Sequence, residues 1–269
     1  MSDDFARRQF LTLLPAVSVF AFDPVRSHPG LVSPESLPEP GFPGQEPAIV
    51  KEAVVAAHGN LARIKELVAA RPALARAAWD WGFGDWETAL DGASHVGNRP
   101  IAELLIANGA RPTIYTAAML GQLAVVRGLI DMMPGVQRNR GPHGITLLAH
   151  ARAGGAAAAD VVRYLESLGD ADLRYTNVPL DDAETGAIAG AYSFGPDAAD
   201  RLTVAKSARG GLTIQRSGMV ERPLFHQGGL VFNPAGAEAV KIRVEMTARR
   251  ARRLVVEDGA TVVEAMRVS

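Results

Sequence analysis

The chain has 269 residues, a formal net charge of -1 from 28 basic and 29 acidic side chains, and no cysteine. This balance leaves no global field that would attract nucleic acid, and the lack of cysteine excludes disulfides and thiolate metal sites. Hydrophobic residues make up 48% of the chain and aromatic residues only 6%. These values predict a folded chain, rich in alanine helices, that forms one large or two ordinary domains.

The N-terminus has the order of an export signal. Arg7 and Arg8 are followed by Phe10 and Leu11, and a mostly apolar run continues to Phe22. This order resembles a twin-arginine signal, so residues 1–22 are expected to direct the chain to the periplasm or outside the cell. The alternative is an N-terminal tail with two adjacent arginines by chance. The apolar run is shorter than a membrane-spanning helix requires, and we expect no integral membrane span.

Residues 23–46 form the second segment. They contain six prolines among glycines and serines, and another proline follows at position 47. Proline ends helices and cannot pair inside a sheet, so we interpret this segment as a linker.

Four segments that can be superimposed by their glycines follow the linker. They cover residues 53–68, 88–110, 116–130 and 144–169. In each segment a short helix is predicted to end at a glycine, and an apolar helix with the i, i+3, i+4 spacing follows at once. A single hairpin of this kind cannot bury its apolar face, so the four units are expected to stack.

Short motifs in these units resemble ankyrin repeats. Thr88-Ala89-Leu90 and Thr146-Leu147-Leu148 stand where that family has its Thr-Pro-Leu turn, and Gly109-Ala110 stands where it has Gly-Ala. The resemblance implies a repeat solenoid of about four units over residues 47–179. The turn glycines are unequally spaced, which predicts a long insertion before the second unit.

Residues 180–269 change to alternating apolar segments. The predicted strands include residues 202–204, 212–214, 230–232, 240–246 and 254–257, separated by turns such as Gly-Gly and Asp-Gly. They predict a small antiparallel barrel or sandwich. Gly190-Ala191-Tyr192 and the segment 264–267 resemble the lipocalin-like domain appended to hydrolases of the β-lactamase type. The expected fold class is therefore a multidomain α + β chain.

A search for catalytic and metal motifs finds none. His58, His95, His143 and His150 fall in different units, and no ligand spacing typical of a metal motif links them. His58 and His95 stand just before turn glycines, where a polar side chain can connect neighbouring units by hydrogen bonds. The sequence therefore predicts no enzyme, no metal and no cofactor.

Two loops are the predicted contact sites for a partner. The first holds all three tryptophans, and its candidate residues are Trp79, Trp81, Phe83, Asp85 and Trp86. Aromatic side chains are enriched in binding hot spots, and glycines allow a loop to present them. The second loop contributes Arg138, Arg140 and His143, and stacking in register would place both loops on one concave face.

The leading functional hypothesis is a non-enzymatic scaffold. It would bind another protein, expected in the cell envelope, through the concave face of the repeats. The alternative is small-ligand binding, or a hydrolase-accessory role, for the C-terminal β domain. A cavity with converging polar groups inside that domain would favour the alternative.

Overall fold

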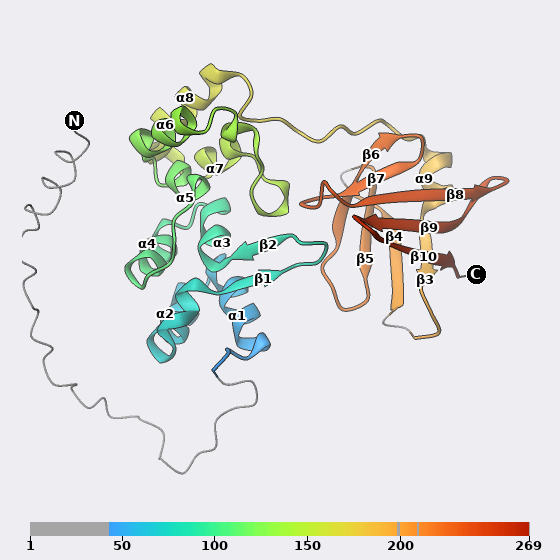
Figure 1. Ribbon diagram of the computed structural model, residues 1–269, viewed down its shortest axis with the longest axis horizontal. Helices are drawn as coiled ribbons and strands as arrows, with labels where there is room; N and C mark the ends of the chain where they lie inside the picture. The colour runs from blue at the N-terminus through green and yellow to red at the C-terminus, as the bar shows by residue number, and fades with distance from the viewer. Residues whose placement is uncertain (1–42, 198–199, 209, 269) are drawn as a thin grey trace, which may run out of the picture. The chain divides into compact units, whose positions relative to one another are not determined.

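The computed structural model describes residues 43–197, 200–208 and 210–268. The predicted export signal at 1–22 and almost all of the predicted linker at 23–46 lie outside the described residues. From Gly44 onward the chain forms one compact unit, with helices in its first part and a sheet in its last part (Figure 1).

The helices of the first part come in pairs. In chain order they are α1 (Pro47–Ala57) with α2 (Leu61–Ala70), α3 (Ala89–His95) with α4 (Arg99–Ala107), α5 (Ile114–Met119) with α6 (Leu123–Met132), and α7 (Leu147–Ala153) with α8 (Ala159–Leu168). The first helices of successive pairs pack on one another in the order α1, α3, α5 and α7. The predicted succession of helical hairpins is therefore present in the described residues.

Local sequence explains where these helices begin and which face they bury. Asn60, Thr88, Asn98, Thr113 and Thr146 each accept a backbone N–H bond from the first turn of the helix that follows. The second helix of each pair buries one apolar stripe; in α4 it consists of Ile101, Ala102 and Leu105. Neighbouring stripes merge into two continuous cores, one over the first two pairs and one over the last two.

A two-stranded hairpin projects between the first two helix pairs. The strands β1 (Ala78–Asp80) and β2 (Trp86–Thr88) pair antiparallel, with Trp79 opposite Glu87. Short 3-10 turns fill the remaining connections: η1 (Pro72–Arg76), η2 (Val136–Arg138), η3 (Pro142–Gly144) and η4 (Gly155–Ala158). The hairpin corresponds to the insertion expected before the second unit.

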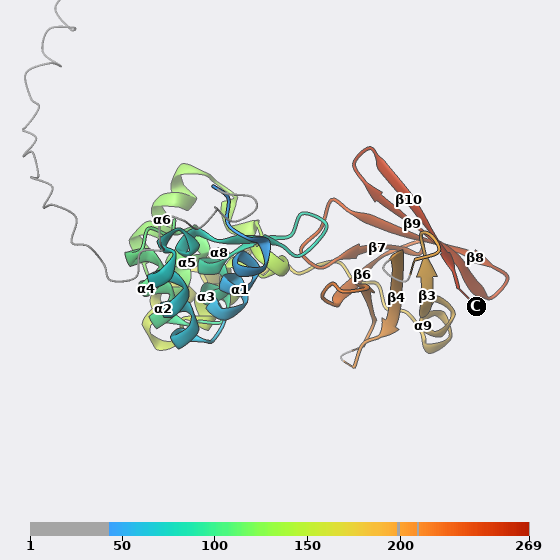
Figure 2. The same ribbon diagram turned by 90° about the horizontal axis from the view of Figure 1, so that it is seen from below.

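The last part is a closed antiparallel barrel of eight strands (Figures 1 and 2). The strands are β3 (Gly190–Ser193), β4 (Arg201–Lys206), β5 (Leu212–Arg216), β6 (Arg222–Gly228), β7 (Val231–Pro234), β8 (Lys241–Thr247), β9 (Arg250–Asp258) and β10 (Thr261–Arg267). Each strand pairs with the next, and β10 closes the barrel against β3. A capped helix, α9 (Asp182–Ile188), precedes the first strand.

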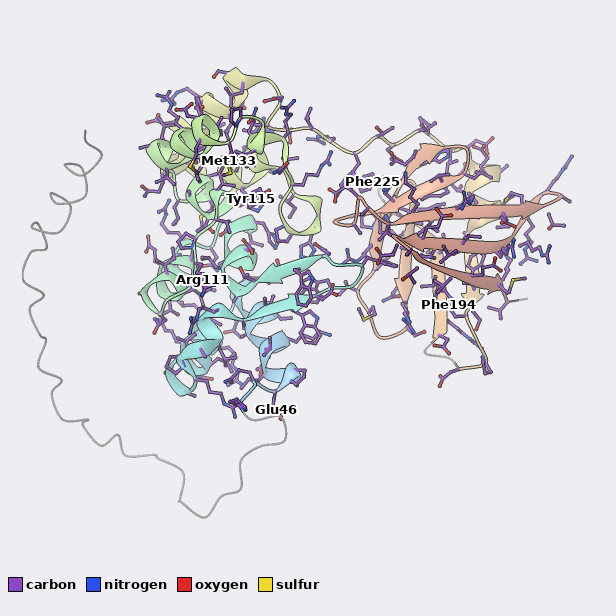
Figure 3. All side chains as sticks on the ribbon, in the orientation of Figure 1. Glu46, Arg111, Tyr115, Met133, Phe194 and Phe225 are labelled. Carbon is purple, nitrogen blue, oxygen red and sulfur yellow. The ribbon has the colours of Figure 1, made fainter. Side chains whose placement is uncertain are left out.

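Buried apolar side chains pack against one another in the barrel. Tyr192, Leu202, Ile214, Phe232 and Leu254 belong to one buried cluster within it. Phe225 of β6, labelled in Figure 3, stacks on Tyr175 with ring centroids 4.4 Å apart.

The structure confirms the α + β class and the barrel, and it excludes the sandwich left open by the sequence. Three strands of the barrel, β3, β6 and β10, were not among the predicted ones. Among the described residues, no helix combines the length and the apolar character that crossing a membrane would need.

Candidate metal centre

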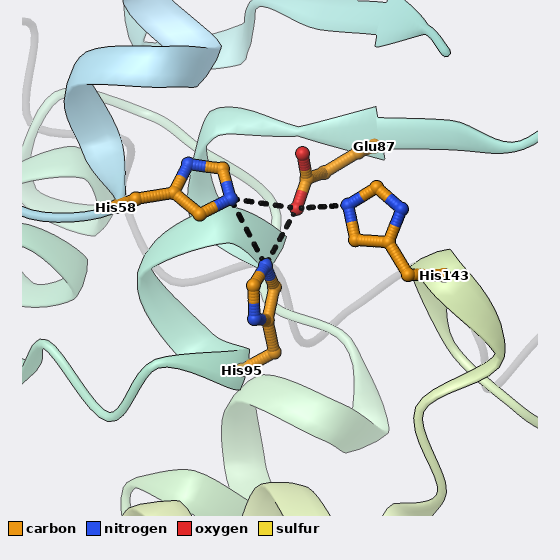
Figure 4. A group of neighbouring side chains, drawn as sticks. All are labelled: His58, Glu87, His95 and His143. Carbon is orange, nitrogen blue, oxygen red and sulfur yellow. Dashed lines mark hydrogen bonds and ion pairs between the residues drawn. The ribbon is translucent and has the colours of Figure 1, made fainter. Parts of the chain in front are cut away.

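Three imidazoles and one carboxylate converge between the first helix pairs (Figure 4). His58 is the C-terminal cap of α1, Glu87 lies in the centre of β2, and His95 is the last residue of α3. His143 comes from η3, the turn before α7. We call these four residues the His3Glu cluster.

The ligand atoms of the His3Glu cluster face one another at short distances. Glu87 Oε1 lies 3.4 Å from His58 Nε2, 2.9 Å from His95 Nε2 and 3.3 Å from His143 Nε2. The Nε2 atoms of His58 and His95 are 3.0 Å apart. All four atoms lie within 4.8 Å of one another. One carboxylate oxygen is therefore surrounded by three imidazole nitrogens.

Hydrogen bonds at the far side of these groups hold them in this orientation. His58 Nδ1 donates to the Val54 carbonyl at 3.0 Å, and His143 Nδ1 donates to Asp85 Oδ2 at 2.8 Å. The indole N–H of Trp81 donates to Glu87 Oε2 at 2.7 Å, which leaves Oε1 for the cluster. Imidazoles that ligate metals are commonly oriented in this way, with the second ring nitrogen bonded to a carbonyl or a carboxylate.

Two backbone features accompany the imidazole rings of the cluster. A Cβ atom on Gly92 would lie 2.9 Å from Cε1 of His58, so only glycine in α3 leaves space for that imidazole. His143 itself has a φ of 60°, in the left-handed region that non-glycine residues rarely adopt. Backbone strain of this kind collects at functional sites, where the surrounding contacts hold it in place.

Glu87 carries the negative charge of the cluster. Burial favours its neutral form, but hydrogen bonds from His143, His58 and His95 outweigh burial and hold the Glu87 pKa well below its usual range. Burial likewise lowers the pKa of His143, yet its bonds to Asp85 and Glu87 dominate and raise that pKa to about 9. The bond to Glu87 also raises the pKa of His58. The buried Glu87 carboxylate is therefore stable in its ionised form only with positive charge beside it.

Asp85 supports the cluster from behind. Its carboxylate accepts the His143 backbone N–H at 2.8 Å and pairs with Arg222 Nη1 at 3.0 Å. The Asp85 pKa is lowered, because hydrogen bonds from His143 outweigh the effect of burial. A fourth imidazole, His150, lies with its ring centroid 6.5 Å from that of His95, and burial lowers its pKa to about 4.

The residues predicted to contact a partner through the tryptophan loop have different surroundings. Trp81 and Asp85 are 8% and 3% exposed, and both serve the His3Glu cluster as described above. Phe83, at the tip of the hairpin, packs against the barrel core. Trp79 is half-buried with the Lys51 ammonium over its ring, whereas Trp86 is 62% exposed. Burial favours internal roles for Trp81 and Asp85.

The second predicted loop meets the first, because His143 bonds Asp85 through both its ring and its backbone. Arg138 is exposed and pairs with Asp170, and Arg140 pairs with Glu238 at 3.4 Å. Of this loop only His143 joins the His3Glu cluster. Partner binding by the other residues stays a prediction.

Sequence reasoning did not foresee that three of these histidines meet Glu87 in one cluster. Its members come from four separate elements, so no spacing rule connects them. One signal was present: His58 and His95 end the first helices of successive units, and stacked units bring equivalent positions together.

Comparison with family models and with curated proteins finds no match for the chain.

Proposed function

We propose that this protein binds one divalent transition-metal ion, zinc in the first place, through His58, Glu87, His95 and His143. The observation that carries the proposal is the approach of the four ligand atoms. A tetrahedral zinc ion with bonds of about 2.0–2.1 Å has ligand atoms about 3.3 Å apart. Four of the separations in the cluster are 2.9 to 3.4 Å.

The remaining pairs involve His143, and they lie within 4.8 Å. Two ligands of one ion cannot be farther apart than about twice a bond length, or roughly 4.2 Å. His143 is therefore the ligand whose ring moves inward when an ion binds. It lies in a short turn and its side chain is 31% exposed, so this movement disturbs little packing.

The ring nitrogens and the carboxylate need a proton or a metal ion between them. His58 uses its Nδ1–H for the Val54 carbonyl, so in the neutral ring the lone pair of Nε2 points at Glu87 and His95. The same holds for His143, whose Nδ1–H goes to Asp85. Lone pairs and a carboxylate at these distances repel one another unless a proton or a metal ion lies between them. Nitrogen and oxygen ligands of this type suit zinc and its neighbours in the first transition series.

The test is zinc titration by calorimetry of chelator-treated protein. We expect one ion per chain, with weaker binding in Glu87→Gln and His143→Gln. Glu166→Gln is the matched control, because Glu166 is a surface carboxylate paired with Arg152 on α7. Absence of zinc binding by the folded wild type, or equal affinity in all variants, would refute the metal site.

Partner binding by the repeats is a second proposal, supported by the exposed ring of Trp86. We assign the stacked helix pairs to the ankyrin type, and we propose export to the periplasm with an envelope protein as partner. A large exposed aromatic ring on a projecting hairpin suits a binding hot spot. Capture of one envelope protein by wild type and its loss in Trp86→Ala would support this role, and equal capture by both would count against Trp86.

A further inference from the structure

A cavity of about 950 Å³ lies next to the His3Glu cluster. His58 and His143 line it, whereas Glu87 and His95 do not. Glu87 is fully buried and His95 is nearly so. An ion held by the four ligands would therefore be covered on the side of Glu87 and His95, and would face the cavity on the side of His58 and His143.

The side that faces the cavity is also the side where the ligand atoms of the cluster lie farther apart. The short separations all involve Glu87 or join His58 to His95, while His143 stands farther from the other two imidazoles. Since His58 and His143 both line the cavity, a ligand from outside would reach the ion between these two rings. Zinc sites that bind small molecules can expand to five ligands, and with four protein ligands here the molecule from the cavity would be the fifth.

The cavity walls are apolar apart from a few charged groups. Carbon-rich side chains on the wall include Val55, Ile145, Val220, Pro223, Phe225 and Ala235. Binding pockets for small organic molecules have this character, with few polar groups that set orientation.

The charged groups on the wall leave one arginine nitrogen for an anion. Arg140, Arg174 and Arg222 line the cavity with two carboxylates, Asp172 and Glu221. Each arginine has an ion pair, with Glu238, Asp172 and Asp85 respectively. Both carboxylates accept hydrogen bonds from threonine hydroxyls, Thr146 for Asp172 and Thr213 for Glu221. Arg222 is 6% exposed, and its Nη2 has no hydrogen-bond partner among the described residues.

The ion itself adds to this preference. A divalent ion with three neutral imidazoles and one carboxylate keeps one uncompensated positive charge. In an apolar surrounding that charge attracts an anion more strongly than it would in water.

We propose that the ion keeps a coordination position toward this cavity, and that the cavity binds a small organic acid whose carboxylate takes that position while its apolar body lies against the wall. This inference rests on the metal site proposed above. It assigns the class of ligand, whereas the zinc titration tests the metal site.

The test uses the full chain with cobalt(II) in place of zinc, because the visible spectrum of cobalt reports its coordination. The probe is 4-phenylbutyrate, compared with its neutral analogue 4-phenylbutan-1-ol and with acetate, which lacks the apolar body. We expect 4-phenylbutyrate to change the cobalt bands saturably, and to bind at least ten-fold more tightly than either analogue.

Two cavity-filling variants examine the location. Ala149→Phe and Val55→Phe place a ring in the cavity from α7 and from α1. Each should lower the affinity for 4-phenylbutyrate at least ten-fold, while the cobalt spectrum of the ligand-free protein stays the same. Ala124→Phe is the matched control on α6, where the alanine is exposed and lies away from the cavity lining.

The possible failures are distinct. A folded wild type without any cobalt bands overturns the metal site and this inference together. Cobalt bands that 4-phenylbutyrate leaves unchanged overturn only the open position. Equal affinity for acetate, or unchanged affinity in both filling variants, overturns the role of the cavity.

Discussion

Replacement of His143 by glutamine should remove most of the stabilisation that zinc gives to the protein. A ligand that binds only the folded state stabilises it by about 2.7 kcal/mol when present at 100 times its dissociation constant. For a unit of this size, that energy raises the unfolding temperature by roughly 5–11 °C. The His143 side chain is 31% exposed and lies in a turn, so its replacement should remove few packing contacts.

The variant allows a numerical comparison. Loss of groups that merely orient a ligand weakens metal binding 10- to 100-fold, and loss of the ligand should reach at least the upper value. At the same zinc concentration a 100-fold weaker site is only half occupied, which leaves about 0.4 kcal/mol of stabilisation. The expected shift in unfolding temperature is then about 1–2 °C.

Scanning calorimetry on chelator-treated protein, with zinc and with magnesium added separately, measures both shifts. Magnesium prefers oxygen ligands and should have no effect on either protein. The reasoning is refuted if zinc raises the unfolding temperature of wild type and of His143→Gln equally. It is also refuted if zinc shifts neither, provided both proteins unfold in one sharp transition.

Three further predictions follow from the same contacts. Asp85→Asn should lower the affinity for zinc 10- to 100-fold in a calorimetric titration, because an amide holds the His143 ring less firmly than a carboxylate does. An unchanged affinity would count against the supporting role of Asp85. Gly92→Ala should lower the affinity for zinc about ten-fold, because the added methyl group displaces the His58 ring. Gly128→Ala, in open space on α6, should leave that affinity unchanged. Equal effects of the two substitutions would contradict the steric argument. Without metal, folding raises the pKa of His143 from 6.5 to about 9, so its stabilising effect is complete below pH 6.5 and is lost as pH rises through 9. Denaturant titrations should show wild type losing on the order of 2 kcal/mol over this range relative to His143→Gln, and parallel curves would exclude this linkage.

The helix pairs could be predicted because each is encoded locally. In α4 the apolar stripe, the cap at Asn98 and the glycine at position 109 all stand within a dozen residues. The strands were harder to predict, since β6 contains a proline and β10 has an exposed face of mixed character. Their pairing in a closed barrel depends on partners far along the chain.

The His3Glu cluster could not be predicted for a different reason. Glu87 and His143 belong to a hairpin and a turn whose positions depend on the stacking of the whole helical part. Trp81 shows the same limitation, because an aromatic residue in a glycine-rich loop suggests a surface contact, yet its indole is buried against Glu87. Tertiary neighbours decide such roles, and a single sequence does not reveal them.

Stacked repeats contact only their neighbours, so such arrays tend to fray from their ends one unit at a time. The His3Glu cluster joins α1, α3 and the turn before α7, and so it links units that are not adjacent in the array. An ion at this place would connect the first, second and fourth helix pairs directly. The terminal unit could then detach only together with the interior ones, and the helical part would open in a single cooperative event.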